Sequence, residues 1–438
     1  MSGRNFPLPR GMRDIWMEEM AQRTWINKKI LEVFDRYGFQ LVEPSPIESL
    51  ETLEAKCGSA VRDEIYWFED KAGRKLGLRF DLTVGLARMV SNRPDLALPI
   101  KLGAISNMWR YDEPQHGRYR CFYQWDAEIF GSVEPEADAE IISLSMDVLE
   151  NIGLKTFEVK ISNRKLVEGF LEEIEIKDLD RIEAVLRIID KYRKISKEEF
   201  TEELKKLGLD KTQIEKIFMF ISIGGTSEEF TKKISEISWR NIKIEKGLEE
   251  LGRLFDDLKS FKKAGKCILD MSIVRGIGYY DGIVFEIYDK AGEEIGAIVA
   301  GGRYDGLCKI FGRDLPATGV AGGIERLMLS MMKANLLPSL EKPMRVFVVA
   351  VNQAVREKVL EVVGKLRSWG IPTEFDLRTR SLTKQLEYAD KFGFPVTLIV
   401  GTRELEKGKV RIRDMKKREE KEVEIERLRD ILSGHVNL

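Results

Sequence analysis

The residues best suited to chemistry are concentrated at positions 109–131, in the sequence WRYDEPQHGRYRCFYQWDAEIFG. Arginines stand on both sides of a turn at residues 113–117, and guanidinium groups match phosphate oxygens in shape and charge. If a strand follows the turn, its alternation places Gln124, Asp126 and Glu128 on one face. Such a face is costly to bury unless it binds something. The stretch therefore predicts a site for a partly anionic ligand, with a solvated surface hairpin as the alternative.

A second candidate pair, Asp81 and Thr83, stands between a predicted strand at 75–80 and a predicted helix at 84–90. A carboxylate and a hydroxyl at such a junction are suited to binding a ligand. They are equally suited to capping the first turn of the helix, so both interpretations stay open.

Glycine-rich segments supply the third group of candidates. They are RGIGYYDG at 275–282, GGRYDG at 301–306 and a predicted strand at 318–323, which leads into a helix opening with Ile324, Glu325 and Arg326. Glycines let a backbone or a ligand approach closely. RGIG is a poor dinucleotide fingerprint and GxxxxGK[ST] is absent, so any nucleotide is bound without a P-loop.

The elements that must position these residues fall into three parts. Around the candidates, a helix at 14–37, a strand at 39–42, a helix at 136–151 and strands at 156–161, 268–271, 283–288 and 295–300 predict mixed helix and sheet. Between about 164 and 262, charged helical periods follow one another and predict a helical insertion, with capping boxes at 196–199 and 226–229. Beyond a linker at 337–343, alternating strands and helices predict a small α/β domain with a mostly parallel sheet.

Composition excludes several classes of protein. Lys and Arg total 72 against 73 Asp and Glu, a net charge of -1, so any nucleic-acid surface must be local. The two histidines, His116 and His435, exclude HExxH zinc sites and Ser-His-Asp hydrolysis. The four separated cysteines predict reduced thiols, and we expect a cytoplasmic protein without a membrane segment or signal peptide.

Five motifs in the same order resemble those of the histidyl-tRNA synthetases, a family of class II aminoacyl-tRNA synthetases. Residues 34–46 resemble the first class motif, Arg110 and Asp112 stand in the second, and residues 319–326 resemble the third. RGIGYYDG resembles the histidine-binding signature RGLDYYTG, and GGRYDGL matches the other histidine signature. Single motifs are weak signals, but five in order are a strong one.

The resemblance implies an α+β fold: an antiparallel sheet flanked by helices, a helical insertion and a C-terminal α/β domain. It implies a catalytic domain at 1–336 containing the insertion at about 164–262, a linker at 337–343 and an anticodon-binding domain at 344–438. The implied activity is that of a ligase, which joins L-histidine to ATP as histidyl-adenylate and then transfers histidine to the 3′ end of tRNA(His). ATP and Mg²⁺ would be required, no metal would be held by protein side chains alone, and the enzyme would be a homodimer.

The resemblance also assigns roles to the candidate residues. The implied catalytic cations are Arg110, Arg275 and Arg326. The implied ATP contacts are Arg110, Asp112, Arg118 and Arg326. The implied histidine contacts are Asp81, Thr83, Gln124, Glu128, Arg275, Tyr279, Tyr280 and Tyr304.

Departures from the family pattern occur in the histidine signature. Gly278 and Asp281 replace the usual Asp and Thr, so a carboxylate that would stand close to Arg275 is missing. In addition, Asp112 is shorter than the usual Glu, and Asp81 replaces a Glu found in many members. The competing interpretation is a catalytically silent paralogue that binds histidine as a regulatory subunit of histidine biosynthesis. Such paralogues usually lack the C-terminal domain and some of the arginines that this chain retains.

Overall fold

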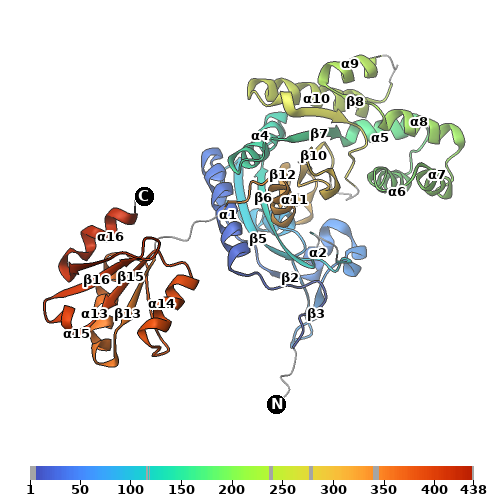
Figure 1. The fold of residues 1–438 in the computed structure, drawn as a ribbon. Helices are drawn as coiled ribbons and strands as arrows, with labels where there is room; N and C mark the ends of the chain where they lie inside the picture. The colour runs from blue at the N-terminus through green and yellow to red at the C-terminus, as the bar shows by residue number, and fades with distance from the viewer. Residues whose placement is uncertain are drawn as a thin grey trace. The chain divides into compact units, whose positions relative to one another are not determined.

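The computed structural model describes residues 6–114, 117, 119–235, 240–275, 280–338 and 345–436. The chain divides into two units, Met1–Pro338 and Ser339–Leu438 (Figure 1). All three groups of candidate residues belong to the first unit.

A nine-stranded sheet organises the first unit, in the order β1-β5-β6-β12-β11-β10-β7-β9-β8. From β5 to β7 every neighbouring pair is antiparallel, whereas β1 pairs with β5 and β9 with β7 in parallel. The strands are β1 (Gln40–Leu41), β5 (Ile100–Trp109), β6 (Cys121–Phe130), β7 (Phe157–Asn163), β8 (Gly224–Gly225), β9 (Cys267–Asp270), β10 (Ile283–Asp289), β11 (Val299–Arg303) and β12 (Ala317–Gly323). The prediction of an α+β fold around an antiparallel sheet is confirmed.

Helices cover one face of this sheet and form the main hydrophobic core. The helices are α1 (Met17–Tyr37), α4 (Pro135–Asn151), α10 (Ile242–Ser260) and α12 (Ile324–Lys333). Trp125, Ala127 and Ile129 of β6 point into this core, where the Trp125 ring meets Phe34 of α1 edge to face. Helix α1 ends at Gly38, whose φ of 72° supplies the left-handed conformation predicted to stop it. Alternation then sends the intervening residues of β6 to the opposite face.

Strand β11 begins later than predicted and runs through the glycine pair. Residues 293–295 form a 3₁₀ turn, and Gly301 and Gly302 lie within the strand. A Cβ at position 301 would collide with the carbonyl oxygen of Gly319 on β12, so the two backbones can approach only because residue 301 is glycine.

The opposite face is bordered by smaller elements. A three-stranded sheet in the order β2-β4-β3 comprises β2 (Ile47–Ser49), β3 (Trp67–Glu69) and β4 (Lys75–Leu78). The helices on this side are α2 (Leu50–Cys57), α3 (Thr83–Ser91) and α11 (Leu307–Ile310). Leu82 and Leu86 of the α3 region pack with Tyr304 and Leu307 in a second core cluster.

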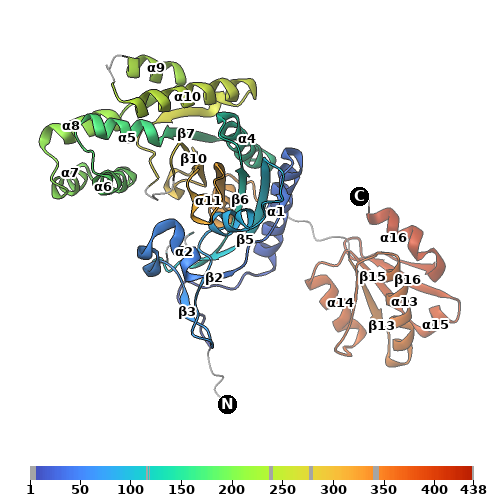
Figure 2. The same ribbon diagram turned by 180° about the vertical axis from the view of Figure 1, so that it is seen from behind.

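The insertion is helical, with one difference from expectation. Its helices are α5 (Arg164–Glu173), α6 (Leu179–Asp190), α7 (Lys197–Lys206), α8 (Lys211–Ile221), α9 (Ser227–Ser235) and α10, and they lie at the β7 side of the sheet in both ribbon views (Figures 1 and 2). Both predicted capping boxes are present, at Ser196 with Glu199 and at Thr226 with Glu229. The short strand β8 within the insertion pairs with β9, an edge contact that helical periodicity alone does not reveal.

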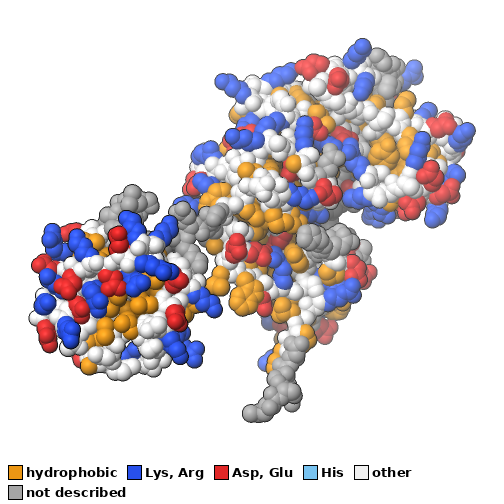
Figure 3. Space-filling model, in the orientation of Figure 1, with side chains coloured by type: hydrophobic (Ala, Val, Ile, Leu, Met, Phe, Trp, Pro, Cys, Tyr) orange, Lys and Arg blue, Asp and Glu red, His pale blue; other side chains and the backbone are white. Residues whose placement is uncertain are grey.

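The second unit holds a five-stranded sheet in the order β14-β13-β15-β16-β17. Its strands are β13 (Val346–Ala350), β14 (Thr373–Phe375), β15 (Val396–Val400), β16 (Lys409–Asp414) and β17 (Glu420–Glu424). Strand β13 pairs in parallel with β14 and β15, whereas the β15–β16 and β16–β17 pairs are antiparallel. The helices are α13 (Arg356–Ser368), α14 (Leu382–Lys391), α15 (Thr402–Leu405) and α16 (Leu428–Val436). On the face drawn in Figure 3, this unit mixes Lys and Arg with Asp and Glu.

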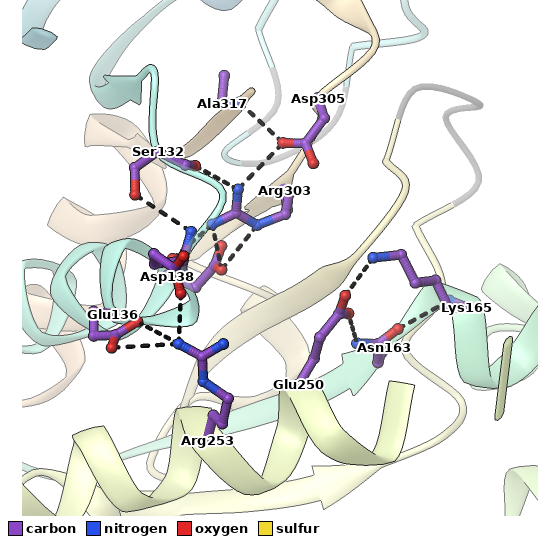
Figure 4. Close-up of polar contacts among 11 residues, drawn as sticks. Ser132, Glu136, Asp138, Asn163, Lys165, Glu250, Arg253, Arg303, Asp305 and Ala317 are labelled. Carbon is purple, nitrogen blue, oxygen red and sulfur yellow. Dashed lines mark hydrogen bonds and ion pairs between the residues drawn. The ribbon is translucent and has the colours of Figure 1, made fainter. Parts of the chain in front are cut away.

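A buried ion pair ties the sheet to helix α4. Arg303, the last residue of β11, lies with its Nη2 2.7 Å from Oδ2 of Asp138, and both side chains are less than 5% exposed (Figure 4). The same guanidinium donates to the backbone oxygens of Ser132 and Glu134 and to Asp305. Burial raises the pKa of Asp138, whereas the Arg303 charge opposes that rise. These bonds hold the end of β11 in place, and Tyr304 is the next residue along the chain.

Replacing Arg303 with leucine should lower the free energy of unfolding by about 3–5 kcal/mol, because the Asp138 carboxylate would stay buried without its cation. Arg253→Leu is the matched control. Arg253 pairs with Glu134 and Glu136 in the same region, but it is 46% exposed, so its loss should cost only about 0–1 kcal/mol. Urea denaturation followed by tryptophan fluorescence measures both. Equal, small losses in the two variants would contradict the role assigned to Arg303.

Candidate active site

The polar face of β6 forms the centre of the site. Gln124, Asp126 and Glu128 share this face, as their alternation predicted, and each is less than 10% exposed. Their partners on β12 are small: Gly323 opposite Gln124, Ala321 opposite Asp126 and Gly319 opposite Glu128. A Cβ at position 319 would overlap Oε2 of Glu128. The Glu128 carboxylate therefore lies across β12 in space that only glycine leaves open.

Glu128 is joined there by two tyrosines. The Tyr304 hydroxyl donates a hydrogen bond to Oε2 of Glu128, and both side chains are almost completely buried. The Tyr280 ring meets Tyr304 edge to face, with ring centroids 6.5 Å apart. The structure thus brings Glu128 together with two candidates that follow it by 152 and 176 positions along the chain. A buried carboxylate held by a phenol can accept a hydrogen bond from an N–H group of a ligand.

Asp81 and Thr83 lie at the start of α3, beside Arg110. Oδ1 of Asp81 accepts a hydrogen bond from the Val84 backbone at 3.1 Å, so the helix-capping contact is present. Arg110 follows β5 and donates from Nε to the Phe80 carbonyl at 2.9 Å, while its guanidinium lies 5.1 Å from the Phe122 ring centroid. These contacts join the end of β5 to the segment that precedes α3.

Arg275 lies in the loop that follows β9, with a φ of 51° in the left-handed region, which is uncommon for residues other than glycine. Its Nη1 is 3.2 Å from Oε1 of Glu286 on β10, and its guanidinium lies 5.5 Å from the Tyr280 ring centroid. Glu286 pairs with Ala300, which pairs with Ala321, the partner of Asp126. Arg275 therefore approaches the same face of the sheet as Asp126, about three strand spacings or ~14 Å along it.

Arg326 occupies the first turn of α12, directly after β12. Its Nη1 donates to the Ala297 carbonyl at 2.8 Å, which links the helix to the segment before β11. Asp112 lies in the turn after β5, where its backbone oxygen accepts a hydrogen bond from Arg120 at 2.9 Å. Arg120 is itself buried against the Tyr111 ring, so this arginine stabilises the turn.

Arg118 and Tyr279 lie outside the described residues, as does Gly278. Glu286 and Tyr288 of β10 were not among the predicted site residues. Glu286 interrupts the otherwise apolar run IVFEIY, a signal that could have identified it. Within the described part of the chain, no group of three or more His, Cys, Asp or Glu side chains could hold a metal ion. No helix among these residues is long and apolar enough to cross a membrane.

Comparison with known proteins finds relatives along nearly the whole chain. The family model for histidyl-tRNA synthetase matches residues 11–327, and that for an anticodon binding domain matches residues 345–435. The histidine–tRNA ligase of Pyrococcus abyssi is 40% identical over 422 residues, 95% of this chain and 96% of the relative. That of Pyrococcus furiosus is 38% identical over 419 residues, with the same coverage. The crystal structure of histidyl-tRNA synthetase from Nostoc sp. PCC 7120 superposes with a TM-score of 0.80 at 27% identity, covering 99% of this chain and all of that one.

The antiparallel sheet, with its polar face on β6 and its arginines at the ends of β5 and β12, is the fold of a class II aminoacyl-tRNA synthetase. Within that class, the chain belongs to the histidyl-tRNA synthetase family.

Asp281 joins the two histidine signatures and should make stability depend on pH. Its Oδ2 accepts from the Gly306 backbone at 3.2 Å, and its own N–H donates to the Arg303 carbonyl. Burial, helped by the nearby Asp305 charge, raises the pKa of Asp281 from 3.8 to about 6. The folded protein therefore binds a proton on the Asp281 carboxyl group more tightly than the unfolded chain does. As a result, the free energy of unfolding falls as the pH rises from about 4 to about 6.

Asp281→Asn should remove this loss, because an amide has no charge to bury. We expect the variant to be more stable than wild type by about 1–2 kcal/mol at pH 7.5 and no more stable at pH 4, after discounting for partial exposure. Urea denaturation at the two pH values measures the difference. Asp314→Asn, in an exposed ion pair with Lys309, is the control and should show no such gain. An Asp281→Asn gain that is independent of pH would contradict this account.

Proposed function

We propose that this chain is a histidine–tRNA ligase, which forms histidyl-adenylate from L-histidine and ATP and transfers histidine to the 3′ end of tRNA(His). The observation that carries the proposal is the buried Glu128–Tyr304 pair beside Tyr280, on the sheet face approached by Arg275. Family membership supports the reaction, because the curated relatives are histidine–tRNA ligases.

The reaction requires cations and positioning more than it requires a base. The histidine carboxylate attacks the α-phosphate of ATP, and negative charge builds up on that phosphate as pyrophosphate leaves. In our proposal Arg110 binds the α-phosphate, Arg326 the γ-phosphate of a bent ATP, and Arg275 the α-phosphate and the substrate carboxylate. The bonds from Arg110 to Phe80 and from Arg326 to Ala297 support preorganised cations. Asp112 and Arg118 would complete the ATP contacts.

The polar face of β6 and its neighbours would bind histidine. A neutral imidazole has one donor and one acceptor nitrogen. Glu128 would accept from the donor, Tyr280 would contact the other nitrogen, and Tyr304 would hold Glu128 in place. Asp81, Thr83 and Gln124 would bind the ammonium group, and Tyr279 would complete the pocket. The Asp81 contact with Val84 fixes this carboxylate at the start of α3.

Mg²⁺ and tRNA would enter with the substrates. Magnesium commonly binds through substrate phosphates and waters with few protein ligands, so ATP would carry it into the site. The second unit would bind the anticodon of tRNA(His), supported by the anticodon-binding family match over residues 345–435. The location would be the cytoplasm.

The silent regulatory paralogue is the alternative function. The chain retains Arg110, Arg275 and Arg326 and has the second unit, all of which favour a catalyst. Histidine-dependent exchange of pyrophosphate into ATP distinguishes the two functions. A histidine-binding regulator forms no histidyl-adenylate, so it cannot catalyse the reverse reaction that incorporates pyrophosphate into ATP. Absence of exchange in a folded preparation that binds histidine would reject the ligase.

Glu128→Ala should raise the KM for histidine in the exchange reaction by about 10- to 150-fold, because a charge-assisted hydrogen bond is worth roughly 1.5–3 kcal/mol. The KM for ATP should change little, since the imidazole lies away from the reacting carboxylate. The control is Glu140→Ala, which removes a carboxylate paired with Lys101 on the helix side of the sheet. A Glu128→Ala enzyme with an unchanged histidine KM would remove Glu128 from the specificity pocket.

We also propose a homodimer. Leu41 of β1, within the first class motif, is 56% exposed, and Trp16 and Met17 at the start of α1 are 73% and 81% exposed, so a monomer leaves these apolar side chains in water. Hydrophobic side chains also reach the surface of the first unit on the face drawn in Figure 3. Light scattering should give about twice the chain mass of 50.3 kDa. Leu41→Asp should shift the mass towards the monomer, whereas Ile242→Asp, at an exposed position on α10, should not. A wild-type monomer at micromolar concentration would contradict the proposal.

A further inference from the structure

The structure offers a replacement for the carboxylate that Gly278 removes. A guanidinium that must bind a phosphate in a defined orientation needs a fixed partner, and the family pattern usually places an Asp three positions after the arginine. Here a carboxylate from the next strand lies beside Arg275: Oε1 of Glu286 is 3.2 Å from its Nη1. We propose that Glu286 is the positioning residue of Arg275 and that Tyr288 orients Glu286. The inference rests on the proposed function, in which Arg275 is the catalytic cation.

Glu286 stands on a rigid part of the sheet. Strand β10 is paired along its length, with Glu286 opposite Ala300 on one side and Lys160 on the other. The side chains of Arg275 and Glu286 are only 21% and 15% exposed, so water screens their attraction less than in a surface pair. A carboxylate fixed on a central strand can define the position of an arginine that lies on a loop.

Tyr288 holds the other oxygen of the same carboxylate. Its hydroxyl donates to Oε2 of Glu286, and the two residues share one face because they are two positions apart on a strand. Burial raises the pKa of Tyr288, and the Glu286 charge raises it further, so the phenol stays a donor at neutral pH. Lys160 lies 4.8 Å from the Tyr288 ring centroid. Glu286 therefore has separate contacts for its two oxygens, one to Tyr288 and one to Arg275.

The loop that carries Arg275 is also fixed at its start. Asp270, the last residue of β9, pairs with Arg193 of the insertion and accepts hydrogen bonds from the backbone and side chain of Ser272. Arg275 then adopts its left-handed backbone conformation. A backbone conformation that costs energy for a residue with a side chain persists where its surroundings maintain it, and the Glu286 contact is part of those surroundings.

A guanidinium stays protonated when a neighbouring carboxylate is removed, and its five N–H donors point in fixed directions within one plane. Losing Glu286 should therefore leave Arg275 charged but poorly aimed. The orientation of the Arg275 guanidinium matters most in the transition state, where negative charge develops on the α-phosphate. Removing Glu286 should therefore lower kcat for exchange and change the KM for histidine much less.

The test measures pyrophosphate exchange in the full-length protein for wild type, Glu286→Ala, Glu286→Gln, Arg275→Ala and the double variant Arg275→Ala/Glu286→Ala. We expect Arg275→Ala to lose about 10²–10³ in kcat. Glu286→Ala should lose at least tenfold, and Glu286→Gln, which keeps an acceptor without the charge, should lose less. The double variant should match Arg275→Ala, because Glu286 acts through Arg275 and the two losses should not add.

Glu158→Ala is the matched control. Glu158 lies opposite Tyr288 on β7 and pairs with Lys290 at 3.1 Å, so it is a partly buried carboxylate of the same sheet without contact to Arg275. Its kcat should equal that of wild type. Losses that add in the double variant, or a Glu286→Ala kcat within twofold of wild type, would overturn the inference. If Glu286→Ala does not fold, a Glu286→Gln kcat within twofold of wild type would overturn the inference instead. Absence of exchange in wild type would reject the proposed function, and the inference with it.

Discussion

The period of two along β6 is the constraint on which the first unit depends. Alternation sends Trp125 and Ala127 into the helix-covered core and, by the same geometry, sends Gln124, Asp126 and Glu128 to the other face. Packing of the apolar side chains in the core stabilises the strand. The polar side chains can therefore be buried, although their burial alone would cost free energy. A shift of one residue in the register of β6 would exchange the apolar and the polar side chains between the two faces. The packing of the apolar side chains in the core therefore also determines which side chains face the site.

Buried charge in this unit is handled in two ways. Asp138 faces a guanidinium whose other contacts are two backbone oxygens and Asp305, so that pair serves the fold. Glu128 faces the hydroxyl of Tyr304, which holds the carboxylate without neutralising it. Arg303 and Tyr304 are consecutive residues, yet one anchors the strand and the other contacts the pocket. The adjacency explains why a single short motif can combine structural and binding roles.

Sequence patterns captured the features that are local in the chain. The alternation of β6, the end of α1 at Gly38 and the capping boxes at Ser196 and Thr226 all depend on neighbours within a few positions. Pairing between distant segments was not accessible. The Arg303–Asp138 pair spans 165 positions, and the β8–β9 pairing places a piece of the insertion in the sheet. Glu286 was missed because a charged residue in an apolar strand shows no partner until Arg275 is located. At Asp81, the structure shows the capping contact that the sequence had left as one of two alternatives.

Gly319 has a consequence for how this pocket could change over evolutionary time. Because the Glu128 carboxylate fills the space where a side chain at 319 would begin, the two positions share one volume across β6 and β12. Enlargement at 319 is compatible with the fold only after residue 128 has become smaller, and that step removes the buried carboxylate. In an alignment of descendants that had drifted to other amino-acid substrates, positions 128 and 319 should therefore covary, with the change at 128 preceding the change at 319.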